Sequence, residues 1–324
     1  GIIIFVALAY KNGEQILSSQ EINKYGIVAG DLAQEIGLKT GDKVLKVNGK
    51  AFTEYKDLVS SDVFLGSNSS YTIERDGKAI EIDIPNNFIE KLSDPEEKGK
   101  FIQPRMPFKV GKLLAGDPAE KAGMEVGDKI VSVDGKSIQF YNEFQAEVPT
   151  HKGKATPFVV ERDGVEKNLT VNVSDEGTVG VGPLSLLHTT TNEYTFAQAL
   201  GVGTKDAFGV VYNNIKGFGK IFRNEVSPSK ALSGPIGIAR MFGGVWDWEN
   251  FWRLTGLLSM VLAFMNALPI PALDGGHAVI LSYEIISGRK PSDTFLENAQ
   301  KVGMVILLGL MAFAIGNDFW KLIF

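Results

Sequence analysis

Residues 115–138, AGDPAEKAGMEVGDKIVSVDGKSI, repeat a pattern that also occurs at residues 29–52, AGDLAQEIGLKTGDKVLKVNGKAF. The two segments align without a gap at an offset of 86 and are identical at 11 of 24 positions. Downstream, IERDG at residues 73–77 matches VERDG at residues 160–164. Similarity at a fixed period is the signature of duplicated structural units. The middle of the chain is therefore predicted to contain two tandem domains.

Each copy of the repeat predicts a small β-rich domain. A short helix is expected to end at Gly37 in the first copy and at Gly123 in the second, because glycine is the usual residue just after a helix. A strand with alternating apolar residues follows. The strand ends at Asn-Gly, residues 48–49, in the first copy and at Asp-Gly, residues 134–135, in the second. Both dipeptides are typical of two-residue β-hairpin turns.

This pattern resembles the bacterial PDZ domain, with limits of 22–98 for the first copy and 101–175 for the second. The first copy departs from the family pattern at Leu32 and Ile36, where Pro and Ala are usual. PDZ domains bind extended peptides by adding a strand to an exposed sheet edge, so the resemblance implies extended peptides as partners. The alternative is that the domains are spacers or lids that bind nothing, since fold alone does not fix function. The candidate peptide-groove residues are Gly26, Ile27, Val28, Val110, Gly111 and Lys112.

The first ten residues, GIIIFVALAY, carry no charge and are followed at once by Lys11. A spanning helix needs about 20 apolar residues. Residues 1–10 are therefore expected to be the end of a transmembrane helix that begins upstream.

Composition excludes several classes of protein. The net charge of −5 and the pI near 5.4 give no indication of a nucleic-acid partner. The chain has no cysteine, which excludes disulfides and thiolate metal sites within it.

The last third of the chain has the composition of a membrane protein. Between residues 254 and 281 the only ionisable side chains are Asp274 and His277. Transmembrane helices are predicted at residues 251–286 and 298–320. The loop between them carries Arg289 and Lys290, so the positive-inside rule places it in the cytosol and the β-rich domains on the periplasmic side.

Residues 192–240 connect the second β-rich domain to the first predicted span. Apolar residues from Phe196 to Phe222 recur at near-helical spacing, which predicts an amphipathic helix lying along the lipid bilayer. A soluble helix packed on the β-rich domains is the alternative. The bend SGPIGIA, residues 233–239, follows it. The predicted fold class is a multi-domain α+β membrane protein, with two tandem β-rich domains inserted between transmembrane α-helices.

An aspartate at membrane depth is costly and marks a functional site by default. In NALPIPALDGGH, residues 266–277, two prolines precede Asp274 and two glycines follow it. Prolines and glycines interrupt a helix and leave backbone polar groups without helical hydrogen bonds. At membrane depth such backbone is tolerated only inside protein or along a cavity. A divalent cation there would compensate the charge of the carboxylate. The alternatives are a structural helix cap for Asp274 and an interhelical hydrogen bond for Asn266.

NxxPxPxLDGG resembles the second active-site motif of the site-2 proteases, the intramembrane zinc metalloproteases. SGPIGIA and the tandem PDZ insertion resemble the bacterial regulator-of-sigma-E branch of that family, and the resemblance covers residues 1–324. It implies Zn²⁺ as cofactor with Asp274 as its third ligand, and substrate contacts at Asn266, Pro269 and Pro271. It also implies a multi-pass protein of the bacterial inner membrane that cuts single-span proteins such as anti-sigma factors or remnant signal peptides. The tandem PDZ domains are then expected to act as a size filter that admits only trimmed substrates.

The other motif of that family is HExxH, which supplies two histidine ligands and a general base. The three histidines here are His151, His188 and His277, and none is followed by Glu. Two zinc ligands and the base are therefore expected upstream of residue 1, and residues 1–324 alone are expected to be inactive. His277 is interpreted as a packing or hydrogen-bonding residue, and the other two as surface residues.

Three other functions fit parts of the sequence. A non-catalytic membrane adaptor would hold peptides on its PDZ pair and would lack HExxH in the whole gene product. A PDZ-bearing serine protease is discarded, because no GxSxG or GNSGG stretch occurs. A transporter with broken helices would share the Pro/Gly interruption, but two recognisable spans are too few for it.

Overall fold

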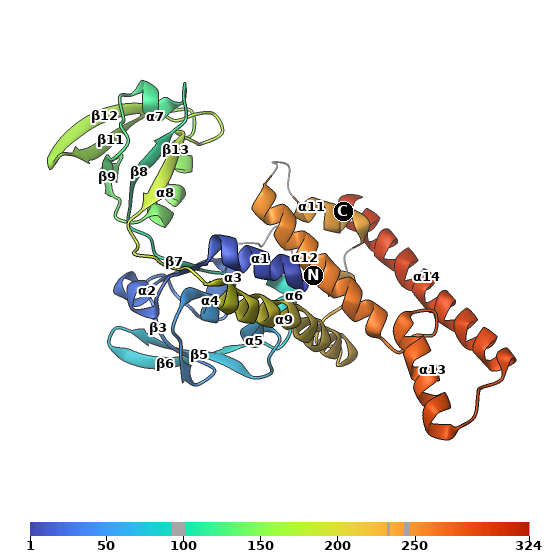
Figure 1. The fold of residues 1–324 in the computed structure, drawn as a ribbon. Coiled ribbons are helices and arrows are strands. Elements are labelled where there is room, and N and C mark those ends of the chain that lie inside the picture. Colours follow the sequence, from blue (N-terminus) through green and yellow to red (C-terminus); the bar gives the residue numbers. More distant parts are fainter. Residues whose placement is uncertain (93–100, 232–233, 243–246, 324) are drawn as a thin grey trace.

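The computed structural model describes residues 1–92, 101–231, 234–242 and 247–323 (Figure 1). Two β-rich units lie at one side of the molecule and a group of helices at the other. The predicted end of the first domain at residue 98 and the first residue of SGPIGIA, Ser233, fall outside the described ranges.

The first β-rich unit is built on a four-stranded antiparallel sheet of order β4-β3-β5-β6. A second, two-stranded sheet pairs β2 with β7. The strands are β2 (Ile27–Ala29), β3 (Lys43–Val47), β4 (Lys50–Ala51), β5 (Ser69–Arg75), β6 (Lys78–Ile84) and β7 (Ile102–Pro104). The helices are α2 (Ser19–Tyr25), α3 (Asp31–Glu35), α4 (Tyr55–Leu58), α5 (Ser61–Phe64) and α6 (Phe88–Leu92).

The second β-rich unit repeats this topology, with a sheet of order β10-β9-β11-β12 and a two-stranded sheet that pairs β8 with β13. The strands are β8 (Phe108–Leu113), β9 (Lys129–Val133), β10 (Lys136–Ser137), β11 (Ala155–Arg162), β12 (Val165–Asn172) and β13 (Val181–Ser185). The helices are α7 (Pro118–Lys121), α8 (Tyr141–Glu147) and the 3₁₀ helix η2 (Val148–His151). A short ribbon, β1 (Glu14–Ile16) paired with β14 (Thr190–Asn192), joins the two ends of the β-rich region.

The predicted hairpin turns are present in both units. Asn48 and Gly49 join β3 to β4 with φ angles of 51° and 73°, and Asp134 and Gly135 join β9 to β10 with φ angles of 49° and 77°. Two consecutive positive φ angles define a type I′ turn, which explains the Asn-Gly and Asp-Gly pairs.

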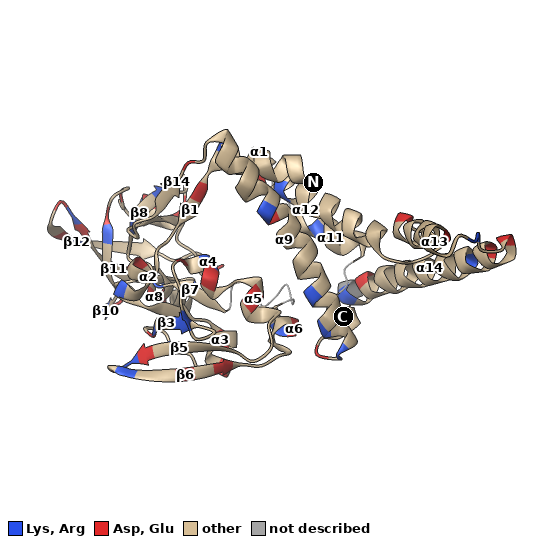
Figure 2. Ribbon diagram, turned by 60° about the horizontal axis from the view of Figure 1, so that its bottom comes forward, with Lys and Arg blue, Asp and Glu red and all other residues tan. Residues whose placement is uncertain are grey.

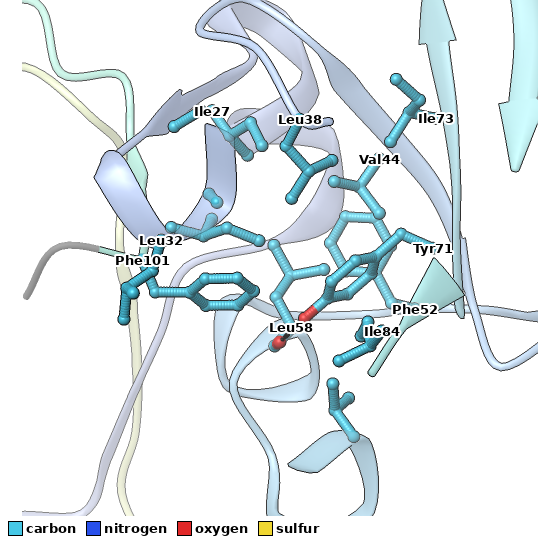
Figure 3. Packing of buried hydrophobic residues seen from close by; sticks show 14 of the residues in the cluster. Ile27, Leu32, Leu38, Val44, Phe52, Leu58, Tyr71, Ile73, Ile84 and Phe101 are labelled. Atoms are coloured by element: carbon cyan, nitrogen blue, oxygen red, sulfur yellow. Dashed lines mark hydrogen bonds between the residues drawn. The ribbon is translucent and has the colours of Figure 1, made fainter. Parts of the chain in front are cut away.

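Apolar side chains from both sheets of the first unit form its core (Figure 3). Tyr71 of β5 is fully buried, and its hydroxyl donates to the carbonyl oxygen of Leu58 at 2.5 Å. Burial raises the pKa of this hydroxyl far above its ordinary value, so it remains a donor. Phe158 of β11 is equally buried at the centre of the second unit.

An ion pair with a buried carboxylate, formed by repeated residues, is present in each unit. In the first, Arg75 donates through Nε and Nη2 to the two carboxylate oxygens of Asp42, both at 2.7 Å. In the second, Arg162 makes the same two bonds to Asp128, at 2.7 and 2.8 Å. The arginines also bond to the carbonyl oxygens of Gly37 and Gly123 respectively. In each unit, the aspartate of the GDK motif therefore pairs with the arginine of the ERDG motif, and this ion pair connects a turn to a strand.

Three helices pack together beside the β-rich units: α1 (Ile2–Asn12), α9 (Phe196–Phe222) and α12 (Trp248–Ala267). Ala199, Gly203 and Ala207 lie one turn apart on α9 and are buried. A Cβ at Gly203 would lie only 2.5 Å from the Cα of Val6 on α1. Small side chains at this spacing let two helix backbones approach closely, as in membrane proteins.

Polar contacts attach α9 to the first β-rich unit. Lys220 is fully buried, and its ammonium donates to the carbonyl oxygen of Asn86 at 2.6 Å and to Glu225 at 3.2 Å. One turn earlier, Lys216 pairs with Asp62 at 2.7 Å. These contacts fix the first β-rich unit against the helical region.

The remaining helices are α10 (Pro228–Ala231), α11 (Pro235–Met241), α13 (Asp274–Ser287) and α14 (Asp293–Ile323). The buried carboxylate of Asp318 on α14 accepts the backbone N–H groups of Gly234, Ile236 and Gly237 at 2.9, 2.9 and 3.0 Å. The described part of the SGPIGIA bend is thereby bound to the last helix.

Within the described residues, one helical stretch is long and apolar enough to cross a membrane, Asp293–Lys321 of α14. The predicted span at 298–320 lies within it. Its middle carries no charged residue between Lys301 and Asp318, and Figure 2 shows most of the charged residues elsewhere. The predicted span at 251–286 consists of two helices, α12 and α13, because prolines at 269 and 271 cannot donate the backbone bonds of a continuous helix.

Candidate functional site

The candidate site lies where α12 ends and α13 begins. Residues 268–273 form a compact loop held by its own backbone: Ile270 N–H donates to Leu268 at 2.7 Å, and Leu273 N–H donates to Ile270 at 3.0 Å. Asp274 is the first residue of α13. A carboxylate at this position is favoured by the positive end of the helix dipole, so the loop fixes a negative group at the start of a helix.

The two glycines after Asp274 are required by close contact between backbones. A Cβ at Gly275 would press against the carbonyl groups of Ala267 and Leu268, and one at Gly276 would lie 2.8 Å from the Cα of Pro271. No side chain fits in either place. The DGG sequence therefore allows α13 to fold back against the loop that precedes it.

Ala272 has a φ angle of 108°, which L-residues rarely adopt. Such a conformation costs about 1–3 kcal/mol and persists only where the surrounding structure imposes it. The strained residue lies two positions before Asp274. The loop is therefore a constrained element of the site.

The predicted site residues lie within this loop or next to it, and most of them are exposed. Asp274, Asn266 and Pro269 are exposed, and Pro271 is half-buried. His277, on the same helix as Asp274, is also exposed. These side chains are available to a partner that approaches the junction of α12 and α13.

The described side chains do not form a complete metal site. Throughout the described ranges, no three His, Cys, Asp or Glu side chains form a group that could hold a metal ion. His151 lies instead 3.0 Å from Glu147, and His188 is exposed 3.4 Å from Glu21. A zinc ion at Asp274 would therefore need donors beyond those that the described residues place there.

A mainly apolar cavity of about 610 Å³ adjoins the loop. Pro269 and Pro271 form one wall, α13 a second, and the beginning of α14 a third. Its other lining residues are Gly276, Val279, Ile280, Tyr283, Pro291, Ser292, Phe295 and Ala299. The two candidate substrate-binding prolines therefore lie at the edge of a space that can hold an apolar side chain, whereas Asn266 is not among its lining residues.

The candidate peptide-groove residues lie at the start of β2 and within β8. Ile27 and Val28 pair with β7, and Val110 and Lys112 pair with β13. On the other side, the N–H groups of Ile27 and Val110 donate to the carbonyl oxygens of Asp42 and Asp128, at 2.9 and 2.8 Å. The backbone at Ile27 and Val110 is therefore already paired on both sides.

Gly26 and Gly111 are packed equally closely. A Cβ at Gly26 would press on the backbone of Gly41 and Asp42, and one at Gly111 would lie 2.7 Å from the nitrogen of Leu184. In these two-stranded sheets, β7 and β13 each pair with a single strand among those that the structure describes.

Sequence reasoning missed two residues at the site, Ala272 and Gly303. An alanine gives no signal of an unusual φ angle. Gly303 gives a weak one, because a glycine inside an apolar helix often marks a close helix contact. Its partner, the backbone of Pro271, lies 32 positions earlier and could not be inferred from spacing.

Comparison with a protein-family model and comparison with individual relatives agree with each other. Residues 1–310 match the model of peptidase family M50. A regulator of sigma E protease from Haemophilus influenzae is 27% identical over 318 residues, which cover 91% of this chain and 70% of that protein. The regulator of sigma-E protease RseP of Salmonella typhimurium is 31% identical over 237 residues, 68% of this chain and 52% of that protein. A Pasteurella multocida relative, 28% identical over 91% of this chain and 70% of its own length, bears a name that assigns it to the zinc metalloproteases.

Proposed function

Because the chain belongs to peptidase family M50 and is a site-2 protease of the RseP type, we propose that it cuts the transmembrane segments of single-span membrane proteins, with Asp274 as a zinc ligand. Anti-sigma factors and remnant signal peptides are the proposed substrates. The observation that supports this best is the position of Asp274. It is an exposed carboxylate at the start of α13, fixed by a strained loop between two apolar helices.

The described residues support one part of such a site. Asp274 offers an oxygen donor of the kind that zinc accepts. The two histidine donors and the general base are proposed to come from a HExxH segment outside residues 1–324, since no histidine here is followed by Glu.

Asn266, Pro269 and Pro271 are proposed to bind the substrate. A substrate helix must unwind before cleavage, which leaves its backbone amides without partners. The exposed side chain of Asn266 can pair with such a backbone, since an amide both donates and accepts. The adjoining cavity would take an apolar side chain of the opened segment.

The proposed location is the bacterial inner membrane, with the Arg289–Lys290 loop in the cytosol and the β-rich units on the periplasmic side. Exposed apolar side chains on α9 support contact with the bilayer: Leu200, Phe208 and Ile215 are 51–56% exposed. A lipid surface would cover them, whereas water would leave them exposed at a cost.

The two β-rich units are proposed to be PDZ domains that filter substrates by size. Each has the same strand order, and β13 pairs with a single strand, β8, among the strands that the structure describes. Leu184 on β13 is exposed. An extended peptide could therefore add to the open edge of β13.

Deletion of residues 25–175 from the full-length protein is expected to allow cleavage of substrates that still carry their bulky extracytoplasmic domain. The physical reason is steric, because the β-rich units would no longer stand between that domain and the membrane. The measurement is cleavage of one model substrate in trimmed and untrimmed forms. Continued rejection of the untrimmed form by a deletion variant that still cuts the trimmed one would show that these units are not the filter.

The proposed activity itself is tested with purified full-length protein and a labelled single-span substrate in lipid vesicles. We expect cleavage inside the membrane segment, loss of cleavage after zinc chelation, and recovery when zinc is returned. Intact substrate under all three conditions would favour a peptide-holding membrane adaptor instead. Mass determination of the two products places the cut.

A further inference from the structure

One glycine outside the LDGG motif touches the site. Gly303 lies on α14, and a Cβ there would overlap the carbonyl oxygen of Pro271 and lie 3.3 Å from the Cβ of Ala272. The backbone of α14 thus rests directly against the loop that leads into Asp274. A Cβ added at Gly309 or Gly316, further along the same helix, would have no described neighbour within 4 Å. Of these three glycines, only Gly303 packs closely against another part of the described chain.

Pro271 is in close contact with the backbones of two glycines. A Cβ at Gly276 of α13 would lie 2.8 Å from the Cα of Pro271, and one at Gly303 of α14 would overlap its carbonyl oxygen. The next residue, Ala272, has the φ angle of 108°. Because a strained residue keeps its conformation only where its surroundings impose it, the two helices provide the constraint.

We propose that Gly303 is a positioning residue for the active site: it lets α14 hold Pro271 and Ala272 in the strained conformation that sets the direction of Asp274 and of the substrate-binding prolines. This inference rests on the proposed function of Asp274. Any larger residue at position 303 must displace the loop, since its contact is with backbone rather than with a side chain that can turn away.

The test compares Gly303→Ala and Gly303→Val with Gly309→Ala and Gly309→Val in the full-length protein. Because displacements of about 1 Å can cost about 100-fold in rate, we expect kcat to fall about 100-fold for G303V and less for G303A, with a smaller change in KM. The Gly309 variants should match the unmodified protein. Alanine is a better helix former than glycine, so a loss at position 303 would not come from a weaker helix.

A second measurement follows the loop without activity. Residues 1–324 contain no cysteine, so Ala272→Cys places a single thiol at the strained position within them. Any cysteine elsewhere in the full-length protein is first replaced by serine. We expect Gly303→Ala to change the alkylation rate of this thiol several-fold, and Gly309→Ala to leave it unchanged.

The outcomes separate the two proposals. Equal kcat and equal alkylation rates for the Gly303 and Gly309 variants would overturn the positioning role. If Asp274→Ala still cleaved substrate, the proposed function would fail, while the alkylation rates would still report whether Gly303 holds the loop. Should G303V fail to fold, G303A and the alkylation rate decide.

Discussion

Replacement of Asp274 by alanine in the full-length protein is expected to reduce substrate cleavage more than about 100-fold, since loss of even an outer partner of a metal ligand costs about 10–100-fold. The carboxylate is exposed at the start of α13 and forms no structural ion pair within the described residues. Its removal should therefore leave the fold intact and affect the site alone. The measurement is the initial rate of cleavage in vesicles, at matched amounts of folded protein.

His277→Ala is the matched control for this prediction. It lies on the same helix, one turn from Asp274, and is also exposed. We expect its cleavage rate to remain close to that of the unmodified protein. Unchanged cleavage by Asp274→Ala would show that the residue is only a helix-terminal carboxylate stabilised by the helix dipole.

The second large effect concerns the fold. Asp128→Ala is expected to destabilise the second β-rich unit by about 3 kcal/mol, because removal of one partner from a buried ion pair leaves the other uncompensated. The side chain of Asp128 is completely buried, and that of Arg162 is 15% exposed. Hydrogen-exchange protection of β9 and β11 in the full-length protein measures the loss.

Glu161→Ala is the control for Asp128→Ala. Glu161 pairs with Lys129 at 3.5 Å, and both side chains are more than 40% exposed. Exposed pairs contribute at most about 1 kcal/mol, so we expect little change in protection. An equal effect of the two variants would contradict the assignment of Asp128 and Arg162 as the pair that stabilises this unit.

The same pair predicts a dependence of stability on pH. Burial raises the pKa of Asp128, but hydrogen bonds from Arg162 and from the N–H of Glu125 lower it more, so the net pKa lies below its ordinary value. A carboxyl group with a lowered folded-state pKa stabilises the protein above its unfolded-state pKa of about 3.9. Protection of β9 should therefore be constant near neutral pH and should fall only as the pH drops below about 4.

Local features of the fold could be predicted from the sequence. The hairpins at Asn48 and Asp134 follow from dipeptides that favour two positive φ angles, and the break in the helix follows from Pro269 and Pro271. In each case the residue itself restricts its own backbone. The repeat at an offset of 86 then predicts that the two units share one topology.

Features that depend on distant parts of the chain could not be predicted. The pairing of β8 with β13 joins segments far apart in the sequence, and it uses the backbone that the sequence assigned to a peptide groove. The packing of Gly303 on Pro271 depends on how α14 returns across the loop. Neither follows from local preference, because both are set by the packing of whole elements.

The most direct test of the central claim, that Asp274 binds zinc, is X-ray absorption spectroscopy of the zinc-loaded full-length protein and of its Asp274→Cys variant. If Asp274 is a ligand, the variant should show one sulfur atom about 2.3 Å from zinc, which the unmodified protein and His277→Cys should lack. A zinc environment without sulfur in a loaded Asp274→Cys variant would contradict the claim.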